Sequence, residues 1–287
     1  MWLTYALASA FFAGVMSILA KIGIRDTDSN LATALRTVVV AIFAWLMVFI
    51  VGSQSTLMQI DAKSVVFLIL SGAATGASWL CYFRALQTGD VNKVVPVDKS
   101  STVLTMLLAF IFLGEGLTLL KVIAMALIAA GTYLMIERKE TVEDNSQSSK
   151  WLLYAILSAV FASLTAILGK IGITGIDSNL GMAIRTIVVL VMAWIIVFMQ
   201  GKQRDIRRIG KRSWIYIGLS GLATGLSWLC FYRALQEGPA SVVVPIDKLS
   251  IIVTIAFGYA VLNERLNKKP LFGLILIVAG TLSLLVP

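Results

Sequence analysis

Long apolar runs with few charges alternate with short polar breaks along the whole chain. A membrane-spanning helix needs about 20 mainly apolar residues, and the pattern predicts ten such segments. They are Trp2–Ala20, Leu31–Val51, Val65–Phe83, Val94–Leu113, Val122–Ile136, Trp151–Gly169, Leu180–Met199, Trp214–Tyr232, Val242–Leu262 and Leu271–Val286. The fifth and tenth are short. The pattern therefore predicts an all-α integral membrane protein with ten transmembrane helices.

The second half of the chain repeats the first at an offset of 149 residues. Residues 21–40 read KIGIRDTDSNLATALRTVVV, and residues 170–189 read KIGITGIDSNLGMAIRTIVV. Five helices per copy is an odd number, so the second copy enters the bilayer upside down. We predict two inverted five-helix repeats, 1–137 and 151–287, joined by a polar linker at 138–150. Inverted repeats recur in transporters that work by alternating access.

The composition limits which catalytic and metal-binding sites the chain can form. Hydrophobic residues make up 59% of the chain and charged residues 14%, and it has no histidine and two cysteines. This excludes histidine-based catalysis, His or Cys metal cages and a disulfide framework. The sequence also has no HExxH motif and no nucleophile paired with a base. We expect no enzymatic activity, no cofactor and no metal site.

The basic residues predict the topology. They concentrate in the loops after odd-numbered segments, such as KQRDIRR after the seventh. The other loops contribute only Lys63, Lys121, Lys170 and Arg233. The positive-inside rule places the basic loops and the linker in the cytoplasm of a plasma (inner) membrane protein, with both termini outside. The net charge of +9 then reflects loops facing anionic lipid, not nucleic acid.

Four basic residues lie inside the predicted helices as two pairs at the repeat offset, Arg36 with Arg185 and Lys99 with Lys248. A charge in the bilayer core costs a few kcal/mol or more, so each is a functional candidate. The alternative is that each side chain snorkels from a helix end to the membrane surface.

Asp98 and Asp247 each come two residues after a proline. Because proline suits the first turn of a helix, we expect each aspartate at a helix N-terminus, where the dipole stabilises a carboxylate. There it could bind a substrate amine or a proton. The alternatives are a plain cap or an ion pair with Arg84 or Arg233.

Together these residues predict two equivalent polar clusters that flank a central cavity and gate it by forming ion pairs in alternation. The predicted binding and gating residues are Arg36, Arg84, Asp98, Lys99, Arg185, Arg233, Asp247 and Lys248. Each cluster holds three basic groups and one acid, which favours amphoteric or anionic substrates.

Other residues of the two repeats have simpler interpretations. The cavity-lining candidates are Trp79, Tyr82, Trp228 and Tyr232, for which packing is the alternative. The pairs Thr75-Gly76 and Thr224-Gly225 are expected to allow close helix contact. Cys81 and Cys230 are interpreted as unreactive cysteines in apolar surroundings, and Glu115 and Glu264, near helix ends, as structural.

These motifs resemble a known family. SGAATGASWLCYFRAL and SGLATGLSWLCFYRAL, followed by VVPVDK or VVPIDK and then LGE or LNE, are similar to the EamA unit of the drug/metabolite transporter superfamily. The resemblance covers both halves. It implies a ten-helix carrier of small metabolites, often an exporter of amino acids or related compounds. Members usually keep both termini in the cytoplasm, and the charge pattern here departs from that.

We therefore expect a secondary transporter that exports small amphoteric or anionic metabolites such as amino acids. One alternative is a flippase of a lipid or lipid-linked anionic headgroup. Another is a multidrug or organic-cation exporter, but the first helix has no acidic residue before Asp26, where cation-exporting relatives carry a glutamate. The expected partners are a small molecule, the bilayer and possible coupling protons, with the protein a monomer or homodimer.

Overall fold

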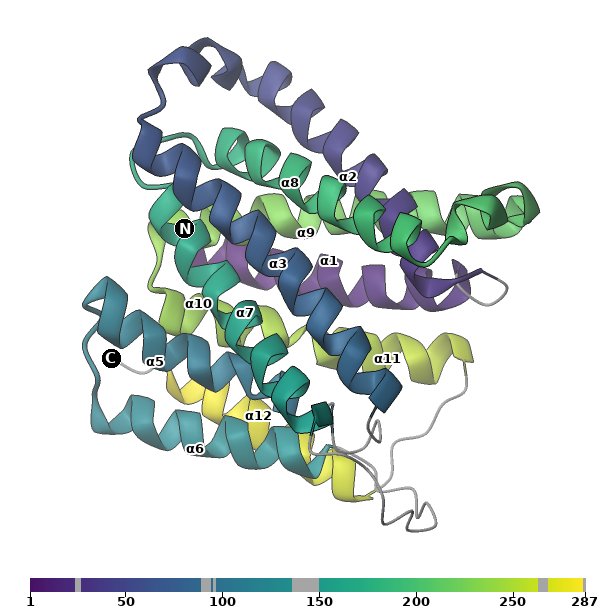
Figure 1. Cartoon of the computed structure of the whole chain (residues 1–287). Helices are drawn as coiled ribbons and strands as arrows, with labels where there is room; N and C mark the ends of the chain where they lie inside the picture. Colours follow the sequence, from purple (N-terminus) through teal and green to yellow (C-terminus); the bar gives the residue numbers. More distant parts are fainter. Residues whose placement is uncertain (24–26, 89–93, 95–96, 136–149, 263–267, 286–287) are drawn as a thin grey trace. The chain divides into compact units, whose positions relative to one another are not determined.

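The computed structural model describes residues 1–23, 27–88, 94, 97–135, 150–262 and 268–285 (Figure 1). Every regular element in these ranges is a helix. They are α1 (Trp2–Gly23), α2 (Ser29–Val51), η1 (Ser53–Gln59), α3 (Ala62–Thr88), α5 (Ser101–Leu113), α6 (Leu119–Leu134), α7 (Lys150–Gly172), α8 (Ser178–Met199), η2 (Lys202–Arg208), α9 (Lys211–Glu237), α10 (Ala240–Lys248), α11 (Ser250–Leu262) and α12 (Lys268–Ser283).

The lengths and apolar character of these helices confirm a multi-span membrane protein. Within the described ranges, seven spans are long and apolar enough to cross a bilayer. The fifth and tenth predicted segments form α6 and α12, which are 16 residues each and therefore about 24 Å long. Both are shorter than the usual hydrocarbon thickness of about 30 Å.

The repeated DSN motif starts the second helix of each repeat. The Asp28 side chain accepts hydrogen bonds from the amides of Asn30 and Leu31, both at 3.0 Å. Asp177 does the same at the start of α8. An aspartate N-cap satisfies amides that have no partner within the helix, so the sequence identity of the two copies reproduces the same helix start.

The described residues fold into two compact units, and each unit draws segments from both sequence repeats. Unit 1 comprises residues 1–76, 168–238 and 246–264, and unit 2 comprises 77–167, 239–245 and 265–287. The repeats are therefore interleaved in space and are not two consecutive domains. The predicted linker lies outside the described residues except for Lys150, which begins α7.

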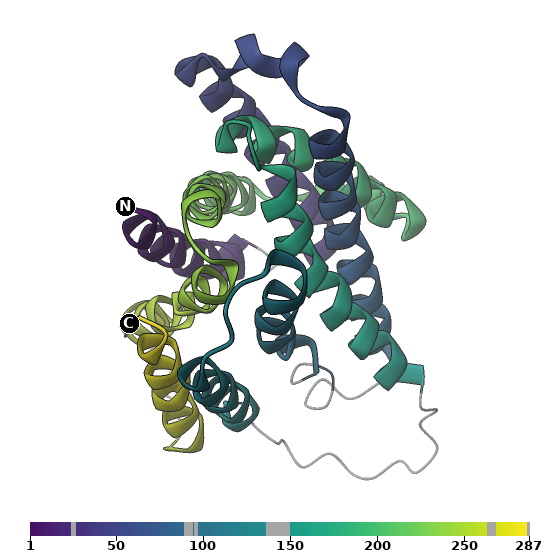
Figure 2. The same cartoon turned by 90° about the vertical axis from the view of Figure 1, so that its left-hand side faces the viewer.

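Equivalent helices run in opposite directions within each unit. In unit 1, the Asn30 side chain at the start of α2 donates to Gln200 Oε1 at the end of α8, at 2.7 Å. Figure 1 shows α2 and α8 running antiparallel. In unit 2, α6 and α12 lie side by side (Figure 2). The second repeat is therefore inverted relative to the first.

Glycines allow the backbones of α6 and α12 to approach each other closely. A Cβ added at Gly131 would lie 2.6 Å from the Gly273 carbonyl oxygen, and one at Gly280 would lie 2.9 Å from that of Ala124. Gly131 and Gly280 are equivalent positions of the two repeats. Such backbone approach is the usual way in which helices associate in lipid, where the hydrophobic effect is absent.

The SG-ATG motifs play the same role in unit 1. Gly72 and Gly76 of α3 would clash with α8 if they carried a Cβ, while Gly221 and Gly225 of α9 would clash with α2. The prediction of close helix contact at these threonine-glycine pairs is confirmed. In each case the third helix of one repeat packs on the second helix of the other.

The ninth predicted span is broken into two helices. Leu249 separates α10 from α11, and its amide donates to the carbonyl of Ile246, three residues back, at 2.9 Å. Pro245 lies inside α10, where a proline removes one hydrogen bond and crowds the preceding turn. In the first repeat, residues 97–99 are helical and a turn at Ser100 precedes α5.

The expectation that Pro245 begins a helix is therefore wrong. α10 begins five residues earlier, directly after Pro239, whose carbonyl accepts the amide of Val243 at 2.9 Å. Asp247 consequently lies in the last turn of α10 and not at its N-terminus. The equivalent proline of the first repeat, Pro96, lies outside the described residues.

Candidate functional site

Asp247 is held by a serine from the other repeat. The Ser9 hydroxyl of α1 donates to Asp247 Oδ1 at 2.6 Å. The Ser227 hydroxyl of α9 donates to the Ser9 carbonyl at 3.2 Å and lies 3.3 Å from Ser9 Oγ. Both serines are buried. The C-terminal end of a helix disfavours negative charge. The hydrogen bond from Ser9 therefore offsets the unfavourable interaction of the Asp247 carboxylate with the end of α10. We call these three residues the Asp247 cluster.

Unit 2 contains the equivalent cluster around Asp98. The Ser158 hydroxyl of α7 approaches Asp98 Oδ1 at 2.7 Å. The Ser78 hydroxyl of α3 donates to the Ser158 carbonyl at 3.1 Å, and the two hydroxyl oxygens are 3.3 Å apart. We call these residues the Asp98 cluster. Each cluster thus joins an aspartate at a helix break to a serine in the first helix of the opposite repeat.

Arg185 of α8 is the most deeply buried charged residue among those described, with 3% of its surface exposed. Its Nε donates to Ser71 Oγ at 3.0 Å, and its Nη2 donates to Thr75 Oγ1 at 2.6 Å. The guanidinium carbon lies 5.0 Å from the Trp228 ring centre and 5.3 Å from that of Tyr232. Two hydroxyls and two aromatic faces therefore surround one cation.

Arg36, the equivalent residue of the first repeat, has different surroundings. Its Nη1 lies 3.3 Å from the Met16 sulfur. The residues that match Ser71 and Thr75 are Ser220 and Thr224, and their hydroxyls donate to carbonyls of their own helix. The sequence pair is therefore symmetric, but its environment in unit 1 is not.

The other predicted charged residues separate into different settings. Lys99, Lys248 and Arg84 have exposed side chains. Arg233 pairs with Glu237 one turn along α9, with Nε and Oε1 2.7 Å apart. Asp247 therefore accepts its hydrogen bond from Ser9, while Arg233 has a different acid as its partner. The proposed alternation of ion pairs between two clusters stays a prediction.

The four predicted aromatic residues also divide. Trp228 and Tyr232 lie against the Arg185 guanidinium, and Tyr232 is buried. Tyr82 packs against a hydrophobic cluster that includes Ala85, and Trp79 is half-buried. Tyr82 thus fits the packing interpretation, whereas Trp228 and Tyr232 contact a buried charge. Cys81 and Cys230 are both free thiols.

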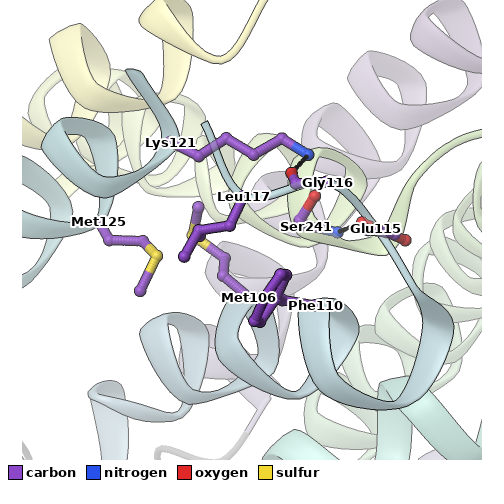
Figure 3. Close-up of a pocket in the computed structure, with 8 residues that line it drawn as sticks. All are labelled: Met106, Phe110, Glu115, Gly116, Leu117, Lys121, Met125 and Ser241. Atoms are coloured by element: carbon purple, nitrogen blue, oxygen red, sulfur yellow. Dashed lines mark hydrogen bonds between the residues drawn. The ribbon is translucent and has the colours of Figure 1, made fainter. Parts of the chain in front are cut away.

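Glu115 has a structural role that joins the two repeats. Its carboxylate accepts hydrogen bonds from the amides of Ala240 at 2.6 Å and Ser241 at 2.9 Å, which caps the N-terminus of α10. It borders a small hollow in unit 2 (Figure 3). The hollow is lined by Met106, Phe110, Glu115, Gly116, Leu117, Lys121, Met125 and Ser241. Glu264 lies outside the described residues.

Sequence reasoning missed the hydroxyl residues of these sites. Ser9 and Ser158, Ser78 and Ser227, and Ser71 and Ser220 are all pairs at the repeat offset of 149. Isolated serines in apolar helices give no periodic signal. Their duplication at one offset is the signal that could have identified them.

Comparison with known proteins adds the family. Residues 1–137 and 149–286 each match the EamA-like transporter family. An uncharacterized transporter in the cobO 3' region of a Sinorhizobium species is 44% identical over 139 residues, which are 48% of this chain and 99% of that protein. An uncharacterized transporter of Archaeoglobus fulgidus is 25% identical over 232 residues, 79% of this chain and 78% of that protein.

A solved crystal structure has the same fold. It aligns with a TM-score of 0.78 over 99% of this chain and 96% of its own, at 14% sequence identity. The two family matches cover one sequence repeat each and together nearly the whole chain. The chain therefore belongs to the EamA-like transporter family.

Proposed function

We propose that the protein is a secondary transporter, without enzymatic activity, that exports small amphoteric or anionic metabolites such as amino acids. The observation that carries this proposal is the setting of Arg185. A buried guanidinium held by two neutral hydroxyls can form a charge-assisted hydrogen bond with an anionic substrate group. The aspartates of the two clusters add acceptors for an amine.

The inverted fold supports alternating access as the mechanism. Each repeat supplies an aspartate at a helix break, and each aspartate contacts the first helix of the other repeat. Discontinuous helices of this kind form substrate and ion sites in many secondary transporters. Both contacts are present in this structure. In alternating access one of the two would open in each state, and their equivalence gives the two states similar energies.

The buried cation disfavours the organic-cation alternative. An exporter of permanently positive compounds would have to bring a second positive charge close to Arg185, where low dielectric strengthens repulsion. The flippase alternative requires a lipid headgroup as the substrate. It is an outcome of the experiment below.

The location and energy source complete the proposal. The charge pattern supports a plasma-membrane protein with both termini outside and the linker in the cytoplasm. If a proton gradient drives export, Asp98 or Asp247 carries the proton, because the chain has no histidine.

The experiment begins with the metabolites released by cells with and without the protein. Released compounds are then tested in proteoliposomes, with and without an imposed pH gradient. We expect Lys99→Ala and Lys248→Ala to slow transport at least about tenfold, because each removes a positive charge from the membrane pathway. Lys63→Ala, an exposed lysine at the start of α3, is the matched control. Transport of lipid but of no soluble metabolite would establish the flippase instead.

A further inference from the structure

Arg185 is incompletely paired although it is enclosed by protein. Its Nε and Nη2 have hydroxyl partners, whereas Nη1 is buried and has no hydrogen-bond partner. A buried donor without an acceptor costs about 1–3 kcal/mol, and more when the group is charged. The arginine is therefore built into the fold with one donor left open.

The charge of Arg185 is also uncompensated. Among the described residues, no carboxylate forms an ion pair with its guanidinium. Ser71 and Thr75 supply dipoles but no charge, and the ring faces of Trp228 and Tyr232 add a weaker cation–π attraction. An unpaired buried charge is strongly destabilising unless an opposite charge joins it. The charge that would complement this site is thus negative.

We propose that Arg185 is the subsite that binds the carboxylate of the transported substrate. A planar guanidinium matches a carboxylate in shape and hydrogen-bonding geometry. One cation balances the single negative charge of a carboxylate, whereas a phosphate dianion would leave one charge unpaired. This inference deepens the proposed function. That the bound carboxylate belongs to a transported substrate rests on that function, whereas the anion site itself is argued from the geometry around Arg185.

The surroundings assign this role to one of the two equivalent arginines. Arg36 contacts a methionine sulfur, and Phe83 takes the sequence position that Tyr232 has in the second repeat. Thr224 donates to the carbonyl of Ser220 as Thr75 does to that of Ser71, but only Ser71 and Thr75 among these four residues also accept from an arginine in the described part of the chain. Arg185 thus has two hydroxyls from the first repeat and two aromatic rings from the second, and these are the surroundings of an anion subsite.

The closed geometry defines how a ligand enters. Nη1 is enclosed, and Gly72 of α3 lies against the backbone of Arg185, where an added Cβ would be 3.0 Å from its carbonyl oxygen. α3 must therefore separate from α8 before a carboxylate reaches the guanidinium. Ser71 and Thr75 lie on the same helix, so their hydrogen bonds to Arg185 break in the same movement. A carboxylate then takes the place of the two hydroxyls.

The test measures binding to the purified full-length protein. Sodium acetate and sodium benzoate are the carboxylate probes, sodium phosphate is the phosphate probe, and sodium chloride at equal ionic strength is the salt control. Thermal unfolding is followed as each salt is titrated, since a ligand that binds the folded state raises the unfolding temperature. We expect a saturable rise with the carboxylates and none beyond the chloride baseline with phosphate.

Variants of Arg185 test whether the carboxylates bind at this residue. Arg185→Gln should abolish the rise or weaken the apparent affinity by at least about tenfold, as expected for loss of a charge-assisted hydrogen bond. Arg185→Lys, which keeps the charge without the planar fork, should retain weaker binding and guards against misfolding of Arg185→Gln. Arg212→Gln is the matched control, because Arg212 is exposed and contacts the Tyr216 ring at 5.8 Å.

Each outcome decides the inference. A carboxylate effect that persists in Arg185→Gln, an equal effect of chloride, a stronger effect of phosphate, or no effect of any probe would overturn it. Carboxylate binding that depends on Arg185, together with proteoliposomes that transport no carboxylate, would keep the inference and reject the proposed export function. Transport of carboxylates that is unchanged in Arg185→Gln would keep the proposed export function and reject the inference about Arg185.

Discussion

At the scale of single residues, small hydroxyl side chains determine where the charged groups lie. Ser9 and Ser158 hold the two aspartates, and Ser71 and Thr75 hold Arg185. A hydroxyl can donate to a carboxylate or accept from a guanidinium without adding charge to the membrane interior. These hydrogen bonds thus position the charged groups without neutralising them.

The serine contacts predict a measurable loss of stability. Ser158→Ala and Ser9→Ala should each lower the free energy of unfolding by about 1–3 kcal/mol, because each leaves a carboxylate without its hydroxyl donor. Thermal unfolding in one detergent measures the effect. Ser55→Ala is the control, since the Ser55 hydroxyl donates to the Gly52 carbonyl on an exposed surface. Equal unfolding temperatures for all three variants would contradict the role of the clusters.

The sequence identified the charged residues more readily than their partners. Arg185 and Asp247 are conspicuous because charge is costly in an apolar helix. Ser9 and Ser71 are not, because an isolated serine costs little there and its partner lies far along the chain. The alternative of an ion pair between Asp247 and Arg233 is not realised, because Arg233 pairs with Glu237 one turn away.

At the scale of helices, glycines set the packing and prolines set the breaks. The apolar runs correctly predicted helices because backbone groups in lipid must be satisfied within the segment. The sequence does not predict the helix break near Asp247, because a proline also suits the first turn of a helix and Pro245 is expected there. Pro239, which precedes α10, has that position, and the Glu115 carboxylate completes the helix start from the other repeat.

The helix contacts predict opposite effects for two glycine substitutions. Gly131→Ala should destabilise the protein by about 1–3 kcal/mol, because its Cβ would meet the Gly273 carbonyl oxygen and Ile277 of α12. Gly218→Ala should be neutral or stabilising by up to about 1 kcal/mol, because open space surrounds this helical position. Unfolding temperatures check both values, and a Gly131→Ala protein as stable as Gly218→Ala would refute the close contact.

At the scale of the whole molecule, duplication explains more than composition does. The offset of 149 residues relates the two aspartate clusters, the glycine contacts and the antiparallel pairs α2 with α8 and α6 with α12. Inversion could be predicted because it follows from an odd number of spans. The interleaving of the repeats could not, because the sequence does not specify which copy a helix packs against.

The predicted orientation can be tested by cysteine labelling in a variant without Cys81 and Cys230. One cysteine is placed in the segment 141–149, which lies outside the described residues. A membrane-impermeant thiol reagent should leave it unlabelled in intact cells and label it after permeabilisation, because the positive-inside rule places the basic loops in the cytoplasm. Ready labelling in intact cells would show the opposite orientation.

The partners of α1 have a consequence for how the chain is made. α1 packs against α9 and α11, and the Ser9 hydroxyl donates to Asp247. The ribosome completes these partners after several intervening helices have been synthesised. α1 must therefore enter the bilayer and persist there as a lipid-surrounded helix before its native neighbours exist. Its apolar surface, which carries no charged side chain before Lys21, allows α1 to remain stable in lipid until its partners are inserted. Insertion and packing are thus separate steps in the biogenesis of this protein.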